Sequence, residues 1–436
     1  MQVHENIVNQ EEVKKGKISR MGWGMILFLF VSMVINYMDK AIIGLASVQL
    51  IDELNLSPNQ WGLVGSSFFW LFSITGMVGG FLADKYGTKR ILSFMAGSWS
   101  IIQFAIVFTV SLPYLIVSRV LLGAGEGPAY PVAMASGSKW LPKDKLGIGL
   151  TMINLGGNIG VAIATPIIVY IMATAGWRSG FITMAIVGVI WLILWHLFAK
   201  ESPHLDSIPK LDKKKSAPSF SFSEIRLFLF NKNFILLVLV GFASHWTFAV
   251  VLTWLPNYFS SVRQISEAST GWVWVAQAIA QISFALLSDK IYRKTGNVRK
   301  SRVYILGAIA ITCGILFYFA PLVSSNIMVV IMFSLSLGLS GVFFVLSPSV
   351  IDSFVPPQHR AKGMGILMAF VTLAGIIGPF VTGNIIQFSS TQAAGFTNSF
   401  QFLALLFIVF GTLFWIGCRP DSSIKVEKEE FKESVF

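Results

Sequence analysis

The chain has 436 residues, of which 54% are hydrophobic and only 12% are charged, and its formal net charge is +12. Soluble domains usually carry about 25% charged residues, so this composition excludes an ordinary soluble protein and indicates a polytopic membrane protein. The two cysteines, Cys313 and Cys418, lie within or at the end of apolar segments, which argues against a disulfide framework. The first 20 residues are polar and lack the apolar core of a cleavable signal sequence.

Twelve apolar segments have the length of a membrane-spanning helix, about 20 residues. They are approximately 23–48, 61–83, 91–110, 113–136, 147–173, 178–199, 233–259, 268–288, 302–321, 326–351, 362–387 and 397–418. With the N-terminus inside, the outside loops contain only Arg178 and Arg263, and nearly all other Lys and Arg lie in inside loops or tails. The positive-inside rule therefore predicts that both termini are cytoplasmic. The basic charge is then an orientation signal, so the expected partner is the lipid bilayer and not nucleic acid.

The first apolar segment contains an ionisable pair, Asp39-Lys40, preceded by Asn36 and Tyr37. The fourth contains Arg119 and Glu126, which are seven residues, or two helical turns, apart. They therefore share a helix face and stand roughly 10 Å apart along its axis. Charges within a membrane are costly and nearly always face a bundle interior or a watery cavity. These four charges predict a pathway for a substrate and an ion.

Small residues accompany the second pair. Gly123, Gly125 and Gly127 surround Glu126. Such residues let a neighbouring helix approach closely.

A polar region at 200–232, rich in Pro, Ser and Lys, divides the spans six and six and predicts a flexible cytoplasmic linker. The expected organisation is a cytoplasmic N-terminal tail, an N-terminal six-helix bundle, the linker, a C-terminal six-helix bundle and a cytoplasmic C-terminal tail. Their residues are 1–20, 21–199, 200–232, 233–418 and 419–436.

The two halves share a repeated loop. Gly80-Phe-Leu-Ala-Asp84 continues through Gly87, where we expect a tight turn, to Arg90. An acid, a basic cluster and a turn glycine recur from Asp289 in the second half. Gly-rich and Pro-containing segments also correspond between spans 5 and 11. Two halves related in this way are typical of a carrier with its site midway across the membrane. The fold class predicted is all-α, with twelve transmembrane helices in two bundles related by pseudo-two-fold symmetry.

The loop from Gly80 to Arg90 resembles, position for position, the signature loop of the major facilitator superfamily. Within that superfamily, the chain is similar to the anion:cation symporters, which include bacterial sugar-acid and other organic-anion carriers. The motif from Asn36 to Lys40 and the motif from Arg119 to Pro131 carry this closer resemblance, which extends over about residues 20–418.

The resemblance implies roles for the charged residues. Asp39 and Glu126 match acids that take part in proton coupling, and Asp84 is expected to act as an inner-gate latch with Arg90 as its local partner. Lys40 matches a position that is usually Arg and contacts the substrate. Arg119 is expected to pair with Asp39 or Glu126, with direct substrate contact as the alternative. The competing interpretation is that Asp39–Lys40 and Arg119–Glu126 are fixed structural pairs.

Two departures from the sugar-acid carriers concern the substrate. Phe72 stands where those carriers tend to have Tyr, and Met368 falls near a position where they place Asn. Apolar linings favour ligands with aromatic or aliphatic bodies. We therefore expect a less hydroxylated anion, either an aromatic or a small aliphatic carboxylate.

Other intramembrane polar residues have a simpler interpretation. Asn36 and Tyr37 could hydrogen-bond a carboxylate. Helix–helix hydrogen bonding is the main expectation for Asn158, Gln277, Gln281 and His245, and contact with the substrate is the alternative for each. An interfacial aromatic belt is expected for most of Trp254, Trp272 and Trp274.

The chain has no phosphate-binding Walker loop and no paired catalytic His/Cys or metal-ligand cluster, so neither an ATP-driven pump nor a membrane enzyme is expected, and no cofactor or metal. The favoured function is proton-coupled uptake of an organic carboxylate by alternating access. An exchanger or uniporter of the same fold, and a scaffold without transport, are the alternatives. The short loops suggest a bacterial cytoplasmic membrane, and the fold suggests a monomer.

Overall fold

The computed structural model describes residues 20–142, 145–200, 228, 230–355 and 360–419. This part of the chain is helical with short connections and contains no strand, which confirms the all-α prediction. Nearly all of the two predicted tails, and most of the linker predicted at 200–232, lie outside the described residues.

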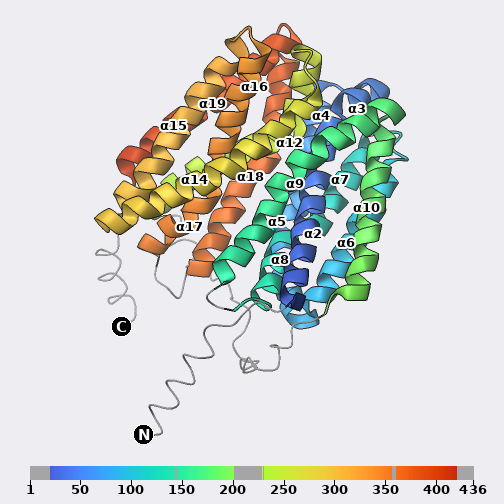
Figure 1. Ribbon diagram of the computed structural model, residues 1–436. Helices are drawn as coiled ribbons and strands as arrows, with labels where there is room; N and C mark the ends of the chain where they lie inside the picture. Colours follow the sequence, from blue (N-terminus) through green and yellow to red (C-terminus); the bar gives the residue numbers. More distant parts are fainter. Residues whose placement is uncertain (1–19, 143–144, 201–227, 229, 356–359, 420–436) are drawn as a thin grey trace.

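The first half of the chain forms a series of helices that Figure 1 shows in blue to green. They are α2 (Arg20–Leu45), α3 (Ser47–Leu54), α4 (Pro58–Ser67), α5 (Phe69–Tyr86), α6 (Thr88–Ile106), α7 (Leu112–Glu126), α8 (Ala129–Ser138), α9 (Leu146–Ala175) and α10 (Trp177–Phe198).

The second half forms a second series, drawn in yellow to red (Figure 1). It comprises α12 (Lys232–Thr253), α13 (Leu255–Asn257), η2 (Tyr258–Val262), η3 (Glu267–Thr270), α14 (Gly271–Thr295), η4 (Arg299–Val303), α15 (Tyr304–Phe319), η5 (Ala320–Leu322), α16 (Asn326–Ser340), α17 (Val342–Phe354), α18 (Arg360–Gln387) and α19 (Gln392–Gly417).

Nine helical stretches in the described part of the chain are long and apolar enough to cross a membrane. The predicted segments outside this set are 61–83, 91–110 and 113–136. The first and third are each divided into two helices, at Phe68 and at Gly127-Pro128, and α6 in the second has 19 residues. The count of twelve crossings therefore stays a prediction.

Local sequence explains where several helices begin and turn. Ser57 caps α4 through a reciprocal pair of hydrogen bonds with Gln60, and Pro58 occupies the first turn, where its missing N–H costs nothing. The chain turns between α5 and α6 at Gly87, whose φ of 89° a residue with a side chain rarely adopts. The predicted glycine turn in the signature loop is therefore confirmed.

Large apolar side chains cover the outer surface of the helix assembly. Five of them are 70% to 75% exposed, on helices from both halves: Phe94, Ile101, Tyr170, Leu197 and Ile327. Apolar surface of this extent marks contact with a membrane or a partner. It agrees with the membrane-spanning character of the helices.

The two halves pack closely at the end of the molecule away from the chain termini, where α4, α12 and α18 meet (Figure 1). A Cβ on Gly62 would lie 2.5 Å from the carbonyl oxygen of Pro379, and one on Gly383 would lie 2.5 Å from that of Pro58. Asn59 also donates a hydrogen bond of 2.7 Å to Asn384. Backbone-to-backbone contact of this kind requires glycine, so the sequence itself permits this end to close.

Gly383→Val is expected to open this end of the molecule. The added side chain would overlap Pro58, and relieving such overpacking typically costs about 1–3 kcal/mol, which favours separation of the halves. A cysteine introduced in place of Asn384 should then react at least about fivefold faster with a polar maleimide. The matched control is Gly365→Val on the same helix, because a Cβ there meets no atom within 4 Å. Equal labelling rates in the two variants would contradict this interpretation.

Candidate functional site

The four charged residues singled out from the sequence come together in the interior, on α2 and α7. Asp39 is 0% exposed, Glu126 1%, and Lys40 and Arg119 are each 3% exposed. The prediction that these charges face the bundle interior and not lipid is therefore confirmed. Burial of four charges strongly disfavours the fold unless each finds a partner or serves a function.

Glycine brings α7 close to α5 at this level. A Cβ on Gly123 would lie 1.8 Å from the carbonyl oxygen of Phe68, and one on Gly127 would lie 2.2 Å from that of Phe72. The predicted close helix approach at these glycines is confirmed. It carries Glu126, between them in sequence, into the interior beside α2.

The ion pair of this cluster joins Lys40 to Glu126. The Lys40 Nζ lies 2.9 Å from Glu126 Oε2, and both side chains are almost fully buried. Asn36 bridges them: its Nδ2 donates to the same Oε2 at 3.2 Å, and its side-chain and backbone oxygens accept from Lys40. The prediction that Asn36 hydrogen-bonds a carboxylate is met here by Glu126.

The alternative pairing, Asp39 with Lys40 and Arg119 with Glu126, is wrong for this conformation. Consecutive side chains on a helix point about 100° apart, so Asp39 and Lys40 cannot share a direction. Arg119 and Glu126 are two turns apart on α7, and the carboxylate of Glu126 pairs with Lys40 instead.

Aromatic rings surround the Lys40 ammonium. Its Nζ lies 5.3 Å from the ring centre of Tyr37, 5.9 Å from that of Phe68 and 5.5 Å from that of Phe72. Ring faces at this distance attract a cation, and the attraction is stronger where water is excluded. Tyr37 and Phe72, both proposed from the sequence to line the site, therefore lie beside its cation. The polar contacts of the ammonium are those to Glu126 and Asn36, and the three rings surround the rest of it.

Arg119 lies beside the ion pair without joining it. Its Cζ is 4.7 Å from the ring centre of Phe68, and its Nε and Nη1 have no hydrogen-bond partner. The expectation that Arg119 pairs with Asp39 or Glu126 is not met by an ion pair among the described residues. A buried guanidinium with unused donors is costly, and these donors can form a charge-assisted hydrogen bond to a carboxylate.

Asp39 has a partner that the sequence interpretation missed. Gln103 on α6 is fully buried, and its Nε2 donates to Asp39 Oδ1 at 2.8 Å. Asp39 Oδ2 and Gln103 Oε1 have no partner. A protonated Asp39 could donate to an amide oxygen, whereas an ionised one could not. The available signal was a lone Gln in the apolar segment 91–110.

Two substitutions of Asp39 are expected to separate its side-chain geometry from its charge. Asp39→Asn can still accept from Gln103 and can also donate to it, so the melting temperature in detergent should stay within a few degrees of the parent. Asp39→Leu leaves a buried amide without a partner, which costs about 1–3 kcal/mol. Equal melting temperatures for the two variants would contradict a structural contact with Gln103.

The other intramembrane polar residues singled out from the sequence divide into two groups. Asn158 on α9 donates to Gln281 on α14 at 3.0 Å, and Gln281 donates to the backbone oxygen of Gly341 at 3.1 Å. The prediction of helix–helix hydrogen bonding is confirmed for this pair. It is wrong for His245, which is buried with neither ring nitrogen hydrogen-bonded.

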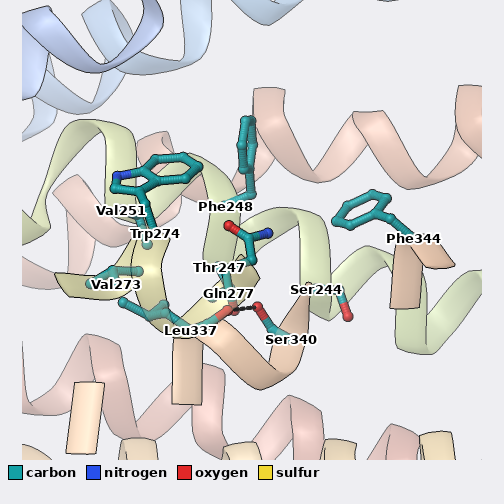
Figure 2. A pocket seen from close by; sticks show the side chains of 10 residues that line it. All are labelled: Ser244, Thr247, Phe248, Val251, Val273, Trp274, Gln277, Leu337, Ser340 and Phe344. Carbon is teal, nitrogen blue, oxygen red and sulfur yellow. Dashed lines mark hydrogen bonds between the residues drawn. The ribbon is translucent and has the colours of Figure 1, made fainter. Parts of the chain in front are cut away.

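Gln277 instead lines a small cavity between α12, α14, α16 and α17. Figure 2 shows its amide facing the rings of Phe248 and Trp274. The cavity has a volume of about 10 Å³, which is close to the room that one water molecule needs. The assignment of Gln277 to the substrate site stays a prediction.

The interfacial belt expected for the three tryptophans is wrong for two of them. Trp272 is 63% exposed, but Trp254 and Trp274 are 1% and 2% exposed. Trp254 donates to the backbone oxygen of Pro379, and Trp274 packs edge-on against Tyr37 across the two halves. Helical periodicity separates these neighbours, since Trp272 and Trp274 lie on different faces of α14.

The predicted inner gate is described in part. Asp289 accepts from Arg302 at 2.5 Å, which ties the end of α14 to η4. Arg90 is exposed near the start of α6. Gly80 lies in α5, and the side chain of Asp84 is not among those described, so the latch between Asp84 and Arg90 stays a prediction.

Comparison with known proteins places the chain in a family. The model of the Major Facilitator Superfamily matches residues 29–355 and 319–436. The chain is 30% identical over 387 residues to a hexuronate transporter of Bacillus subtilis (strain 168), covering 85% of this chain and 90% of that protein. It is 28% identical over 404 residues to a probable sulfoacetate transporter of Cupriavidus necator, covering 88% and 89%.

Solved structures share the fold at low sequence identity. One is a bacterial homologue of the human lysosomal transporter Spinster in an inward-facing, unoccupied conformation, with a TM-score of 0.76, 17% identity and coverage of 94% of this chain and 99% of that one. Another is a D-xylose–proton symporter, with a TM-score of 0.72, 16% identity and coverage of 92% and 99%. The chain belongs to the major facilitator superfamily, and it is a multi-pass membrane transporter and not an enzyme.

Proposed function

We propose that the chain is a proton-coupled symporter that takes up an organic carboxylate by alternating access. The observation that carries this proposal is the buried Lys40–Glu126 ion pair, with Arg119 and Asp39 buried near it and in no ion pair among the described residues. A carrier that uses one site for a proton and an anion needs an acid and a cation that release each other. Lys40 and Glu126 can do this, because a single ion pair joins the cation to the acid.

The coupling step is an exchange of partners at Lys40. Protonation of Glu126 removes its charge and weakens its hold on the ammonium. The substrate carboxylate then takes the place of Glu126, and the donors of Arg119 give it a second contact. With Glu126 protonated, the loaded site carries one negative charge fewer than it would with the anion and an ionised Glu126, so closing the site within the membrane costs less. Release of the anion lets Glu126 lose its proton and pair again with Lys40.

The conformation indicates to which side of the membrane the site is closed. With both termini in the cytoplasm, the closely packed end at Gly62, Gly383 and the Asn59–Asn384 hydrogen bond is the outer end. The described conformation is then closed to the outside. The signature-loop residues Gly87 and Arg90, with Asp289, lie at the cytoplasmic ends of their helices, where an inner gate is expected.

The relatives support an anionic substrate. Their names specify hexuronate, sulfoacetate and, for a protein of Escherichia coli O6:H1 that is 24% identical over 428 residues with coverage of 93% and 97%, D-galactonate. Each of these ligands is the anion of an acid. The two cations of this site, Lys40 and Arg119, suit the same chemical group.

The test is transport by the purified full-length protein in proteoliposomes that contain a pH indicator. Sugar acids, aromatic acids and small dicarboxylic acids are added one at a time. Symport predicts that one class acidifies the lumen and accumulates against its gradient when the outside is acidic. Uptake without any proton signal would contradict symport and favour an exchanger or uniporter.

A further inference from the structure

His245 on α12 is a buried polar side chain of the second half that the coupling mechanism leaves unexplained. It is 6% exposed, and neither Nδ1 nor Nε2 has a hydrogen-bond partner. An unpaired buried polar group costs about 1–3 kcal/mol, so its presence calls for a reason. No anion or cation of the charged cluster bonds to it in the described part of the chain.

Three aromatic rings pack around the imidazole. The ring centre of Phe69 is 5.5 Å away, that of Phe248 is 5.4 Å away and that of Phe344 is 6.2 Å away. Phe69 lies on α5 in the first half, whereas the other two lie on α12 and α17 in the second. His245 therefore lies at the interface where the two halves of the carrier meet.

The same rings connect His245 to Lys40 along two routes. On one route Phe69 packs 6.0 Å from Phe72, whose ring faces the ammonium. On the other route Phe248 packs 6.4 Å from Tyr37, whose ring also faces it. The Lys40 ammonium and the His245 imidazole thus lie at opposite ends of a region bounded by aromatic rings from both halves. We call this region the aromatic box, and its members are Tyr37, Phe69, Phe72, Phe248 and Trp274.

The aromatic box adjoins the small cavity of Figure 2. Phe248 and Trp274 belong to both, and Phe344, the third ring beside His245, also lines the cavity. The ring of Trp274 packs edge-on against Phe248 at 6.0 Å. The cavity and His245 therefore share the rings of Phe248 and Phe344.

We propose that the aromatic box binds an aromatic carboxylate that bears a hydroxyl group opposite its carboxylate, with the carboxylate at Lys40 and the hydroxyl at His245. This inference rests on the proposed function, because it uses the same cation to hold the anion. Edge-on contacts between rings suit a flat aromatic body. A neutral imidazole donates from one nitrogen and accepts at the other, so it can make one hydrogen bond to a phenol, either accepting its hydrogen or donating to its oxygen.

The chemistry of the box also argues against a sugar acid. A polyhydroxylated chain needs several convergent donors and acceptors, and a site that leaves hydroxyls unpaired binds them poorly. The five members of the aromatic box offer only two such groups, the Tyr37 hydroxyl and the Trp274 indole N–H. The apolar Met368 on α18 adds none.

The test measures equilibrium binding to the purified full-length protein by titration calorimetry. The ligands are 4-hydroxybenzoate, benzoate and galacturonate, and the variants are His245→Phe and His245→Gln. The unmodified protein should bind 4-hydroxybenzoate about tenfold more tightly than benzoate, which corresponds to one buried hydrogen bond. His245→Phe keeps a ring and should bring that ratio to about one with benzoate affinity retained, whereas His245→Gln should restore most of it.

Two outcomes would overturn the inference: an unchanged ratio in His245→Phe, or tighter binding of galacturonate than of either aromatic acid. Its failure is distinguishable from failure of the proposed function. Galacturonate that drives protons into proteoliposomes while neither aromatic acid binds would contradict the aromatic class and leave symport standing. Binding of 4-hydroxybenzoate that depends on His245 but moves no proton would support the inference and contradict the coupling.

Discussion

Glu126→Gln is expected to abolish proton-driven accumulation of the anion while leaving exchange of internal for external anion intact. Gln has the shape of a protonated Glu and still accepts from Asn36, but it cannot release a proton. A pH gradient of one unit provides about 1.4 kcal/mol per proton, or about tenfold accumulation. We expect this accumulation to fall to the level of equilibration. Uptake driven by a pH gradient and counterflow without a gradient, both in proteoliposomes, measure the two activities separately.

The matched control for this variant is Glu53→Gln. Hydrogen bonds from Arg178 and Trp177 hold the pKa of Glu53 below its usual value, so Glu53 is an ionised acid outside the buried cluster. Its replacement should leave accumulation within about twofold, since an exposed ion pair is worth about 0–1 kcal/mol. Retained accumulation in Glu126→Gln would show that Glu126 does not carry the coupled proton.

Lys40→Met is expected to weaken binding of the anion by about 10- to 100-fold. The ammonium contributes a charge-assisted hydrogen bond to the carboxylate, worth about 1.5–3 kcal/mol in a buried site. The same change leaves Glu126 buried without its cation, and breaking a buried pair from one side costs about 3–5 kcal/mol. Binding and thermal unfolding in detergent should therefore both be impaired.

A double variant separates these two effects. Lys40→Met combined with Glu126→Gln removes both charges, so the melting temperature should recover while anion binding stays weak. Lys40→Arg, which keeps the charge, should bind within a few-fold of the parent. Recovery of binding in the double variant would mean that Lys40 only neutralises Glu126 and does not hold the substrate.

The fold and the location of the site could be predicted from sequence because both depend on patterns along single helices. Apolar segments of spanning length indicated the all-helical membrane architecture, and Gly87 and Gly123 marked a turn and a close helix approach that the structure contains. Lone charges in such segments can only face the interior, and Arg119 and Glu126 do so on one face of α7.

The pairing within the site depends on how helices rotate against one another, which a single sequence does not reveal. The sequence placed Asp39 next to Lys40, but α2 directs them to Gln103 on α6 and to Glu126 on α7. Trp274 has the composition of an interfacial residue, yet its face of α14 meets the first half. The same limit applies to His245: only the packed structure shows that its nitrogens lack partners.

Proton uptake on binding tests the exchange of partners at Lys40 most directly. The purified protein is placed in a lightly buffered solution with a pH indicator, and saturating substrate is added. Displacement of Glu126 from Lys40 predicts that about one proton is taken up per anion bound at neutral pH, and that Glu126→Gln takes up none. Saturable binding without proton uptake in the unmodified protein, or equal uptake in the variant, would contradict the account.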